Sequence, residues 1–525
     1  MTKTKFAYPF ENIETGMTEQ SIGTFKSQVR SILKNSHLLE DQKRYGLFDA
    51  AFKTLEYPQV SAAAIQAIGE GTVCLINEGP APYHPRYVAP DFQVVLDKGS
   101  EFFGLQPASN LNEAITSLLT LYNYSPTGGP PPYIGRLDQL LDPYVEGQSP
   151  EVVFDLLIMF WTLIDRLQPD AFVHANLGPE ETKIGSLLLE IDDRIKTITN
   201  LTLRYDPQVT PRDFALQAVR NAMHLSKPYF LNHPVHLKEW GEDYVVASCY
   251  NIMRLGGGIF TLVRLNLSEL AHRFKGSVDE LLEKTLPDLV SLQLEVINSR
   301  IRYLVEEVRW FENSIFVKEG LLYPDKFTAY AGVVGLNELV NQVMAAQGKS
   351  ECKYGHDDEA NQLAVSIVST LKSALMNHEA EYCFGSQGKI TFHAQVGISD
   401  DQGITPGCRI PAGSEPDLYS HLRVSAPIQK LVEGGISDIF EFDQTAKNNP
   451  EAILDIIDGA MALGMRDLSI GCVDSEYIRV SGYLVRRSDL ENRQNEKLLR
   501  HDTAHIARGF FSAQPNTLHR RLRQV

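Results

Sequence analysis

The stretch IRVSGYLVRR, at residues 478–487, sets one glycine inside a run that alternates like a β-strand. Ile478, Val480 and Leu484 share one parity with Gly482. Side chains of a strand alternate between its two faces, so this pattern predicts a strand that contains the glycine. Glycine weakens a strand and usually marks a bulge or a close approach of another backbone. The stretch therefore raises the question of what this glycine does so near the end of a long chain.

Gly482 has a chemical property that other residues lack. Loss of its α-hydrogen would leave an unpaired electron shared between an amide nitrogen that donates electrons and a carbonyl that withdraws them. The sharing requires a planar α-carbon, and glycine has no side chain to crowd that plane. The alternative is a structural glycine packed beneath a ring such as that of Tyr483. This stretch alone leaves both interpretations open.

Composition and charge exclude several classes of protein. The chain has 525 residues, 43% of them hydrophobic, and a formal net charge of −17. Such an acidic protein is not expected to bind nucleic acid through a general electrostatic footprint. The N-terminus has no apolar segment of the kind found in signal peptides, and the most apolar window, 152–167, is charged and too short to span a bilayer. We expect a cytoplasmic protein without a membrane segment.

The cysteines predict neither a disulfide framework nor a zinc site. There are six of them, and none forms a C-x-x-C pair. The segment ECKYGHDDE at 351–359 gathers residues that can ligate metals, but we interpret it as a charged surface loop. We therefore predict no metal site and a reducing compartment.

The chain divides into four predicted regions. Residues 1–70 form a helical segment, and 71–470 alternate short apolar strands with helices, a pattern typical of α/β folds with parallel strands. Within the second region, strands flank a glycine-rich loop near 247–260. Residues 471–495 form a loop around Gly482, and 496–525 a basic tail. The strands that we predict outside the loop region lie at 71–79, 389–398, 437–443 and 467–473.

Several short motifs occur in an order that resembles the glycyl radical enzymes. RVSGY resembles the signature of their radical-bearing glycine, and ASCYNIMRLGGGIFTLVRLNLSELA resembles the cysteine finger loop of the anaerobic ribonucleotide reductases. The likeness to the YjjI-type family is greater still. The further stretches that carry these resemblances are GRLDQLLDPYV (135–145), GLNELV (335–340), ITPGCRIPAG (404–413) and GGISDIFEFDQTAKNNPEA (434–452).

The resemblance implies a fold, a reaction type and partners. The fold would be an α/β barrel of about ten strands, in two parallel half-barrels surrounded by helices. A separate radical S-adenosylmethionine activating enzyme would install the radical on Gly482, with no other cofactor bound. The radical would pass to Cys249, whose thiyl would abstract hydrogen from a small-molecule substrate. The family further implies a homodimer that is sensitive to dioxygen.

Two departures from the family pattern bear on the reaction. The anaerobic reductases carry four zinc-binding cysteines just before the glycine, whereas this chain has only Cys472 there. The lyases and dehydratases typically have a glutamate two residues after the thiyl cysteine, whereas this chain has Asn251. We favour a carbon–heteroatom lyase or dehydratase whose general base comes from elsewhere. A ribonucleotide-reductase-like reductase and a catalytically silent barrel that binds a partner remain as alternatives.

Eight further residues are candidates for the substrate pocket. Seven lie beside predicted strand ends or in the matched motifs, where α/β proteins gather polar groups. The eighth, a cysteine on the first predicted strand, matches the place of a second cysteine in the reductases. The candidates are Cys74, Arg136, Asp138, His174, Asn176, His233, His393 and Glu415.

Overall fold

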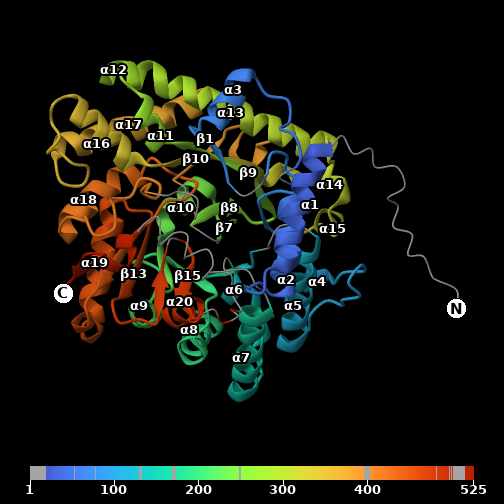
Figure 1. Ribbon diagram of the computed structural model, residues 1–525. Helices are drawn as coiled ribbons and strands as arrows, with labels where there is room; N and C mark the ends of the chain where they lie inside the picture. The colour runs from blue at the N-terminus through green and yellow to red at the C-terminus, as the bar shows by residue number, and fades with distance from the viewer. Residues whose placement is uncertain are drawn as a thin grey trace.

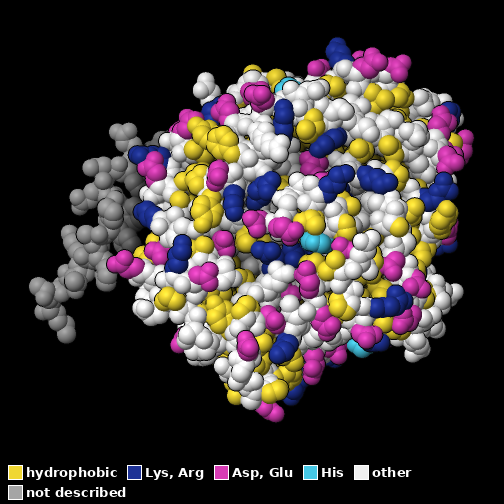
Figure 2. All heavy atoms as spheres, turned by 180° about the vertical axis from the view of Figure 1, so that it is seen from behind, with side chains coloured by type: hydrophobic (Ala, Val, Ile, Leu, Met, Phe, Trp, Pro, Cys, Tyr) yellow, Lys and Arg dark blue, Asp and Glu magenta, His cyan; other side chains and the backbone are white. Residues whose placement is uncertain are grey.

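The computed structural model describes most of the chain and shows helices arranged around a core of strands (Figure 1). The described residues are 19–52, 54–76, 79–128, 133–167, 173–247, 250–394, 403–480, 482–495, 497, 499 and 515–525. Within them, no helix combines the length and apolarity that a membrane span requires. Figure 2 shows acidic and basic side chains interspersed with apolar ones over one face of the molecule.

One sheet has five strands. Its central strand β9 runs parallel to β10, and β10 runs parallel to β11, whereas β1 and β2 pair with β9 in the antiparallel direction. Parallel strands need crossover connections, which helices such as α11 and α13 supply here. The strands are β1 (Val73–Leu75), β2 (Tyr87–Ala89), β9 (Gly257–Asn266), β10 (Phe327–Val334) and β11 (Thr391–His393).

The other large sheet has seven strands in the order β16-β12-β13-β6-β5-β4-β3. Strands β3 to β6 are parallel to one another, as are β12, β13 and β16, and the two groups meet in the antiparallel pair of β6 and β13. The strands are β3 (Gly135–Arg136), β4 (His174–Leu177), β5 (Asn200–Tyr205), β6 (Tyr229–Asn232), β12 (Asp438–Phe442), β13 (Asp467–Cys472) and β16 (Leu522–Arg523).

A hairpin of strands β7 (Tyr244–Ala247) and β8 (Asn251–Arg254) lies between the two sheets, near the centre of Figure 1. One side of this finger hairpin, which includes Val245 and Met253, packs with apolar residues of the five-stranded sheet. The other side, which includes Val246 and Ile252, packs with β6 of the seven-stranded sheet. Alternation along the two strands thus gives the hairpin an apolar surface for each sheet.

A second hairpin carries the glycine with which the sequence analysis began. Strands β14 (Tyr477–Arg479) and β15 (Leu484–Arg486) are antiparallel, and the Val480 amide donates a hydrogen bond to the carbonyl of Tyr483. The prediction of a strand through Gly482 is therefore wrong, because the chain reverses direction at the glycine. Gly482 is buried in the turn of this glycine hairpin.

Helices cover the outer faces of both sheets, and their apolar sides form one large core with the strands. The helices are α1 (Glu19–Lys34), α2 (Glu40–Phe52), α3 (Ala62–Gly69), α4 (Phe92–Lys98), α5 (Leu111–Gly128), α6 (Leu137–Leu141), α7 (Pro150–Leu167), α8 (Lys183–Ile195), α9 (Arg212–Leu225), α10 (His233–Trp240), α11 (Leu267–Arg273), α12 (Val278–Glu280), α13 (Leu286–Arg302), α14 (Trp310–Asn313), α15 (Ile315–Lys318), α16 (Leu336–Ala346), α17 (Asp358–Met376), α18 (Leu418–Gln429), α19 (Pro450–Leu463) and α20 (Arg487–Gln494).

The expected α/β class is confirmed, and local signals account for several boundaries. Ser277 accepts a hydrogen bond from the Glu280 amide at the start of α12, and Pro450 occupies the first turn of α19 after an asparagine cap. Gly256 has a φ of 75° in the turn between β8 and β9, a backbone conformation that glycine adopts without strain. Of the predicted strand 389–398, residues Thr391–His393 form β11, and residues 395–398 lie outside the described residues.

Candidate active site

The two faces of the seven-stranded sheet differ in polarity. On β5, Leu201 and Leu203 belong to the core beneath the helices, whereas the alternate residues Asn200, Thr202 and Arg204 are buried on the opposite face. That opposite face is turned toward the finger hairpin. Buried polar groups in proteins are normally hydrogen-bonded, so their partners indicate what each one does.

Two predicted pocket residues on β4 belong to this inner face. Asn176 donates from Nδ2 to the carbonyl of Val246 and accepts from the Val246 amide at Oδ1, both at 2.9 Å. The amide of Asn176 therefore attaches the finger strand β7 to the sheet. His174 lies with Nε2 2.6 Å from the hydroxyl of Thr202 and 3.2 Å from that of Tyr229. Both side chains face the interior and contact protein groups.

The tip of the finger hairpin carries the predicted thiyl residue. Cys249 itself lies outside the described residues, as does Ser248, so their flanks define the tip. Ala247 pairs with Asn251 across the hairpin, and Tyr250 has a φ of 65° that turns the chain between them. Tyr250 is fully buried, and its hydroxyl lies 2.8 Å from that of Ser469 on β13. The tip of the finger is thus held against the seven-stranded sheet.

Gly482 is held against the same sheet by Asn200. The Asn200 side chain donates from Nδ2 to the Gly482 carbonyl at 3.2 Å and accepts from the guanidinium of Arg479 at Oδ1, also at 3.2 Å. Arg479 donates two further bonds to the carbonyl of Ser226, and the Ser226 hydroxyl donates to the carbonyl of Tyr477. The glycine hairpin is therefore attached to β5 and to the loop before β6 by buried polar contacts.

Aromatic rings lie between the glycine hairpin and the finger. The guanidinium of Arg479 lies 5.4 Å from the ring centre of Tyr229. The Tyr229 ring in turn packs edge-on against that of Tyr250, with 4.6 Å between ring centres. The residue after Cys249 and the residues around Gly482 thus contact one tyrosine in common. Neither a distance nor a contact of Cys249 itself is described.

The five-stranded sheet brings two more predicted residues into one row. Cys74 pairs with Arg264, Arg264 pairs with Gly332, and Gly332 pairs with His393. With adjacent strands about 4.8 Å apart, Cys74 and His393 are separated by about 14 Å across the sheet. The Cys74 thiol donates to the carbonyl of Gly71 at 3.2 Å. Arg264, between the two, is a buried residue that the sequence analysis missed.

His393 reaches the finger tip. A Cβ added to Gly435 would lie 2.1 Å from the carbonyl oxygen of Tyr250 and 3.1 Å from a ring carbon of His393, so both residues abut this glycine. The His393 ring stacks on that of Tyr330, with 4.9 Å between centres. Burial, and to a lesser degree the charge of Arg86, lowers the pKa of His393 to about 3, so the imidazole is neutral at pH 7.

Three groups that the sequence analysis did not propose for the pocket also belong to this interior. Arg409 places its guanidinium carbon 6.0 Å from the ring centre of Tyr250. Asn251 is fully buried, and its Oδ1 has no hydrogen-bond partner among the described residues. Asp467, on β13, lies 3.7 Å from Nε2 of His236, and burial raises its pKa well above the ordinary range. The alternation of side chains along β8 and β13 is the one sequence signal that could have predicted that Asn251 and Asp467 face this interior. Arg409 lies outside the strands and helices, so no such signal exists for it.

The other four predicted residues contact neither Tyr250 nor Gly482 in any described interaction. Arg136 lies 3.9 Å from Asp243 in a shallow pocket. Asp138 accepts hydrogen bonds from the amides of Gly178 and Gln139, and burial raises its pKa to about 6. The remaining two are His233, whose Nδ1 is 2.7 Å from the Tyr244 hydroxyl, and Glu415, which accepts from the amides of Gly413 and Arg521.

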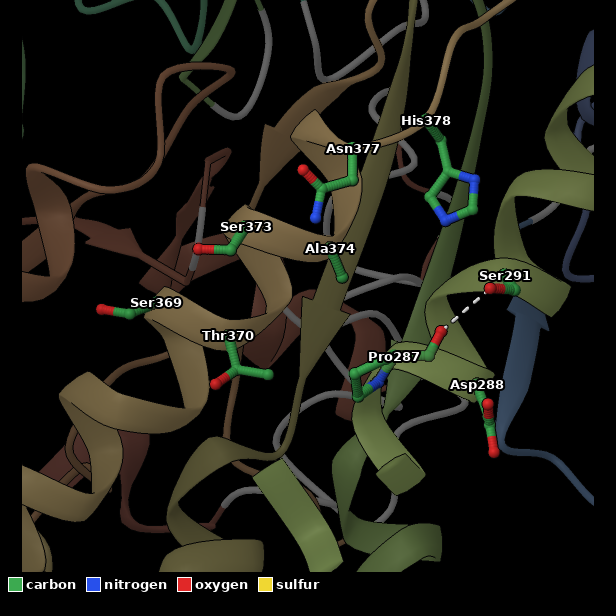
Figure 3. Close-up of a pocket in the computed structure, with 9 residues that line it drawn as sticks. All are labelled: Pro287, Asp288, Ser291, Ser369, Thr370, Ser373, Ala374, Asn377 and His378. Carbon is green, nitrogen blue, oxygen red and sulfur yellow. Dashed lines mark hydrogen bonds between the residues drawn. The ribbon is translucent and has the colours of Figure 1, made fainter. Parts of the chain in front are cut away.

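The outer surface offers a different kind of cavity. A groove of about 370 Å³ lies between α13 and α17, and its lining includes Pro287 and Ser291 of α13 and Thr370 and Ala374 of α17, which Figure 3 draws. None of the predicted site residues lines it. In the described part of the chain, no group of three or more His, Cys, Asp or Glu side chains could hold a metal ion.

Comparisons with known proteins agree with this geometry. A chain of "Uncharacterized protein YjjI" from Escherichia coli strain K12 is 40% identical over 474 residues, which cover 90% of this chain and 91% of that one. Among solved structures, the anaerobic ribonucleotide reductase of Thermotoga maritima in complex with dATP and CTP superposes with a TM-score of 0.64 at 13% identity, over 90% of this chain and 89% of the reductase.

A dehydratase superposes at least as well. The structure described as 1,2-propanediol dehydration in Roseburia inulinivorans gives a TM-score of 0.69 at 11% identity, over 96% of this chain and 89% of that one. At such low identity these two structures establish the fold alone. The family model "Glycyl radical enzyme YjjI-like" matches residues 38–523. The chain therefore belongs to the YjjI-like family of glycyl radical enzymes.

Proposed function

We propose that the protein stores an unpaired electron on Gly482 and transfers it to Cys249, which abstracts a hydrogen atom from a small-molecule substrate. The observation that carries the proposal is the position of the glycine hairpin. Gly482 is buried beside Asn200, and Arg479 of the same hairpin contacts the Tyr229 ring that packs on the finger tip. Two segments more than 200 residues apart in sequence thus share one buried neighbour.

The Asn200 amide supports the storage of the radical. Its N–H donates to the Gly482 carbonyl, the group that withdraws electron density from the α-carbon. A hydrogen bond polarises that carbonyl further and so favours delocalisation. Burial excludes water and dioxygen from the α-carbon. Because the glycine is buried, the hairpin has to leave its place before a separate radical S-adenosylmethionine activating enzyme can remove a hydrogen atom from it.

The reaction that we favour is a redox-neutral elimination. The Gly482 radical takes the hydrogen atom from the Cys249 thiol, and the thiyl takes one from a substrate carbon. The substrate radical expels a leaving group from the adjacent carbon, and the product radical recovers the hydrogen atom from Cys249. Asn251 is no base, so the proton that the substrate radical loses goes to another group. Asp467 beside His236 is buried and its raised pKa keeps it protonated, so it is a candidate for the acid that gives a proton to the leaving group. The homodimer of the family belongs to the same proposal.

Electron paramagnetic resonance tests the radical. We expect anaerobic incubation with an activating enzyme, S-adenosylmethionine and a reductant to give a doublet that collapses to a singlet when glycine is α-deuterated. Gly482→Ala should abolish the signal, whereas Cys249→Ala should keep the signal and lose turnover. If no signal forms while a known glycyl radical enzyme is activated in parallel, a silent barrel that binds a partner becomes the better interpretation.

The requirement for a reductant distinguishes the two reaction classes. A lyase regenerates its thiyl in every cycle and should turn over repeatedly after excess reductant has been removed. A reductase consumes two electrons for each product and should stop after one turnover. Repeated turnover without reductant therefore supports the lyase, and a single turnover supports the ribonucleotide-reductase-like alternative.

A further inference from the structure

Arg409 is a buried cation with free hydrogen-bonding capacity. The residue is 6% exposed, and its Nε donates to the carbonyl of Ser437 at 2.7 Å. Both terminal nitrogens, Nη1 and Nη2, have no hydrogen-bond partner among the described residues and are shielded from water. A guanidinium ordinarily uses these N–H groups in bidentate contacts with carboxylate or phosphate. A buried charged group left in this state destabilises the folded protein.

Asp438 interacts electrostatically with Arg409 but does not bond to its terminal nitrogens. Asp438 lies close enough for the charge of Arg409 to contribute to a lowered pKa of its carboxyl. Its two oxygens, however, lie 3.3 Å from Nε2 of His421 and 2.8 Å from Nε2 of Gln429, on helix α18. Asp438 therefore balances part of the charge of Arg409 without making a hydrogen bond to it.

The neighbourhood of Arg409 is also the neighbourhood of the finger tip. Its guanidinium faces the Tyr250 ring, and Ser437, which anchors it, follows the Gly434–Gly435 pair that abuts Tyr250 and His393. His393 has no partner for either ring nitrogen among the described residues. Arg409 and His393 thus both contact the segment 435–437, and both have nitrogens without hydrogen-bond partners among the described residues. Both also lie next to Tyr250, the residue that follows Cys249.

Other cations add to the positive potential of this region. Arg520 is buried and close enough to Arg409 and Tyr250 to interact electrostatically with both. The charge of Arg86 lowers the pKa of His393. The buried Arg264 pairs with Gly332, which in turn pairs with His393. Glu415 and Glu441 interact with Arg520. Carboxylates are thus present around Arg520, while the Arg409 terminal nitrogens stay without one.

We propose that Arg409 binds an anionic group of the substrate, a carboxylate or a phosphate, through Nη1 and Nη2, and so fixes the reacting carbon beside the finger tip. This inference rests on the proposed function, because it takes the finger tip to be the place of hydrogen abstraction. A ligand that reaches the shielded nitrogens has to displace a neighbouring side chain, so binding should be slower than diffusion. The substrate class is then small organic acids or phosphate esters.

Thermal unfolding in the presence of simple anions tests the proposal. The probes are inorganic phosphate and acetate, each compared with sodium chloride at equal ionic strength. A ligand that binds the folded state raises Tm in a saturable way. We expect such a rise with at least one probe in the wild-type protein, and its loss in Arg409→Gln. The probe that gives the larger rise distinguishes a phosphate site from a carboxylate site.

Two controls separate anion binding from folding. Arg409→Gln loses the Nε bond to Ser437 and the charge that faces Asp438 but no bond of the terminal nitrogens, so Tm without anion should fall less than in the control below. Arg300→Gln removes an equally buried guanidinium, whose Nη1 donates to the carbonyls of Gly79 and Pro80, and should lower Tm but keep the anion-dependent rise. The proposal is overturned if neither probe exceeds chloride in the wild type, or if Arg409→Gln keeps the rise.

The radical signal distinguishes failure of this inference from failure of the proposed function. Arg409 contacts neither Gly482 nor the glycine hairpin in any described interaction, so Arg409→Gln should keep the doublet. A doublet in the wild type without an anion-dependent rise in Tm overturns the anion site and leaves the radical function standing. An anion-dependent rise without a doublet supports the site and overturns the radical function.

Discussion

Two sets of buried polar side chains surround the finger hairpin, and they differ in whether they have partners. On the side of the seven-stranded sheet, the amides of Asn176 and Asn200 each use both their donor and their acceptor. In the second set, Arg409, beside the start of β12, and His393, on β11, have unused nitrogens among the described residues. All four side chains are at least nine-tenths buried, so exposure to water does not explain the difference.

The difference indicates a division of roles within one interior. A fully bonded amide stabilises the segment that it contacts, here the finger strand and the glycine hairpin. A buried polar group without a hydrogen-bond partner lowers the stability of the folded protein. Its presence in a native protein therefore needs a reason other than stability, such as the binding of a ligand. Substitutions in the two sets should therefore change stability by different amounts, which makes the comparison testable.

The largest effect is expected at Asn176. Asn176→Ala leaves the amide and the carbonyl of Val246 buried without partners, so the free energy of unfolding should fall by about 3 kcal/mol. Calorimetric Tm and urea unfolding measure the loss. Asn313→Ala, at an exposed asparagine, is the matched control and should change stability by no more than about 0.5 kcal/mol. Equal effects of the two variants would contradict the attachment of the finger by Asn176.

A smaller effect is expected at Asn200. Asn200→Ala removes two bonds of 3.2 Å, to Gly482 and to Arg479, and should cost about 1–2 kcal/mol. The loss should concentrate in the glycine hairpin, so amide hydrogens of 477–486 should exchange faster while those of the finger strand β7 stay protected. Hydrogen-exchange mass spectrometry measures both segments at once. Unchanged exchange in the hairpin would show that Asn200 does not hold it.

The smallest effect at neutral pH is expected at His393. His393→Phe keeps a ring against Tyr330 and removes two unpartnered nitrogens, so stability at pH 7 should stay within about 1 kcal/mol of the wild type or rise.

Acid should enlarge the effect of His393→Phe. The folded-state pKa of His393 is lowered to about 3 from an ordinary value of 6.5, so below pH 6.5 the unfolded chain binds a proton that the folded protein does not. The wild type should therefore lose stability from pH 6.5 down to about 3, and the variant should lose less. Parallel stability curves for the two proteins would mean that His393 is not buried in a neutral state.

The arrangement of strands could be predicted because its signals are local. The apolar runs at 437–443 and 467–473 correspond to β12 and β13, and the capping signals at Ser277 and Pro450 mark real helix starts. A loop was predicted around Gly482, but the hairpin that reverses at this residue was not. Its alternation fits a strand, and only the Val480–Tyr483 bond and the long-range contact of Asn200 show that the chain reverses there.

The site could be predicted only in part, because side-chain partners depend on tertiary contacts. His174, Asn176 and His393 lie on inner faces of the sheets, as expected of residues beside strand ends. The sequence pattern did not show that Asn176 bonds to the finger, nor that Glu415 bonds to the backbone of the C-terminal segment. Arg409 lies outside every strand and helix, so no periodicity pointed to its place beside Tyr250.

The attachment of β13 to the seven-stranded sheet limits how far Gly482 can travel. Strand β13 ends at Cys472, ten residues before Gly482, and β16 rejoins the same sheet next to β12. While β13 stays folded, a fully stretched chain of ten residues reaches about 35 Å. Under the function proposed above, a separate activating enzyme has to bring its reactive centre within that radius of the end of β13. The length of this tether, rather than any surface contact, sets the largest distance at which the two proteins can exchange a hydrogen atom.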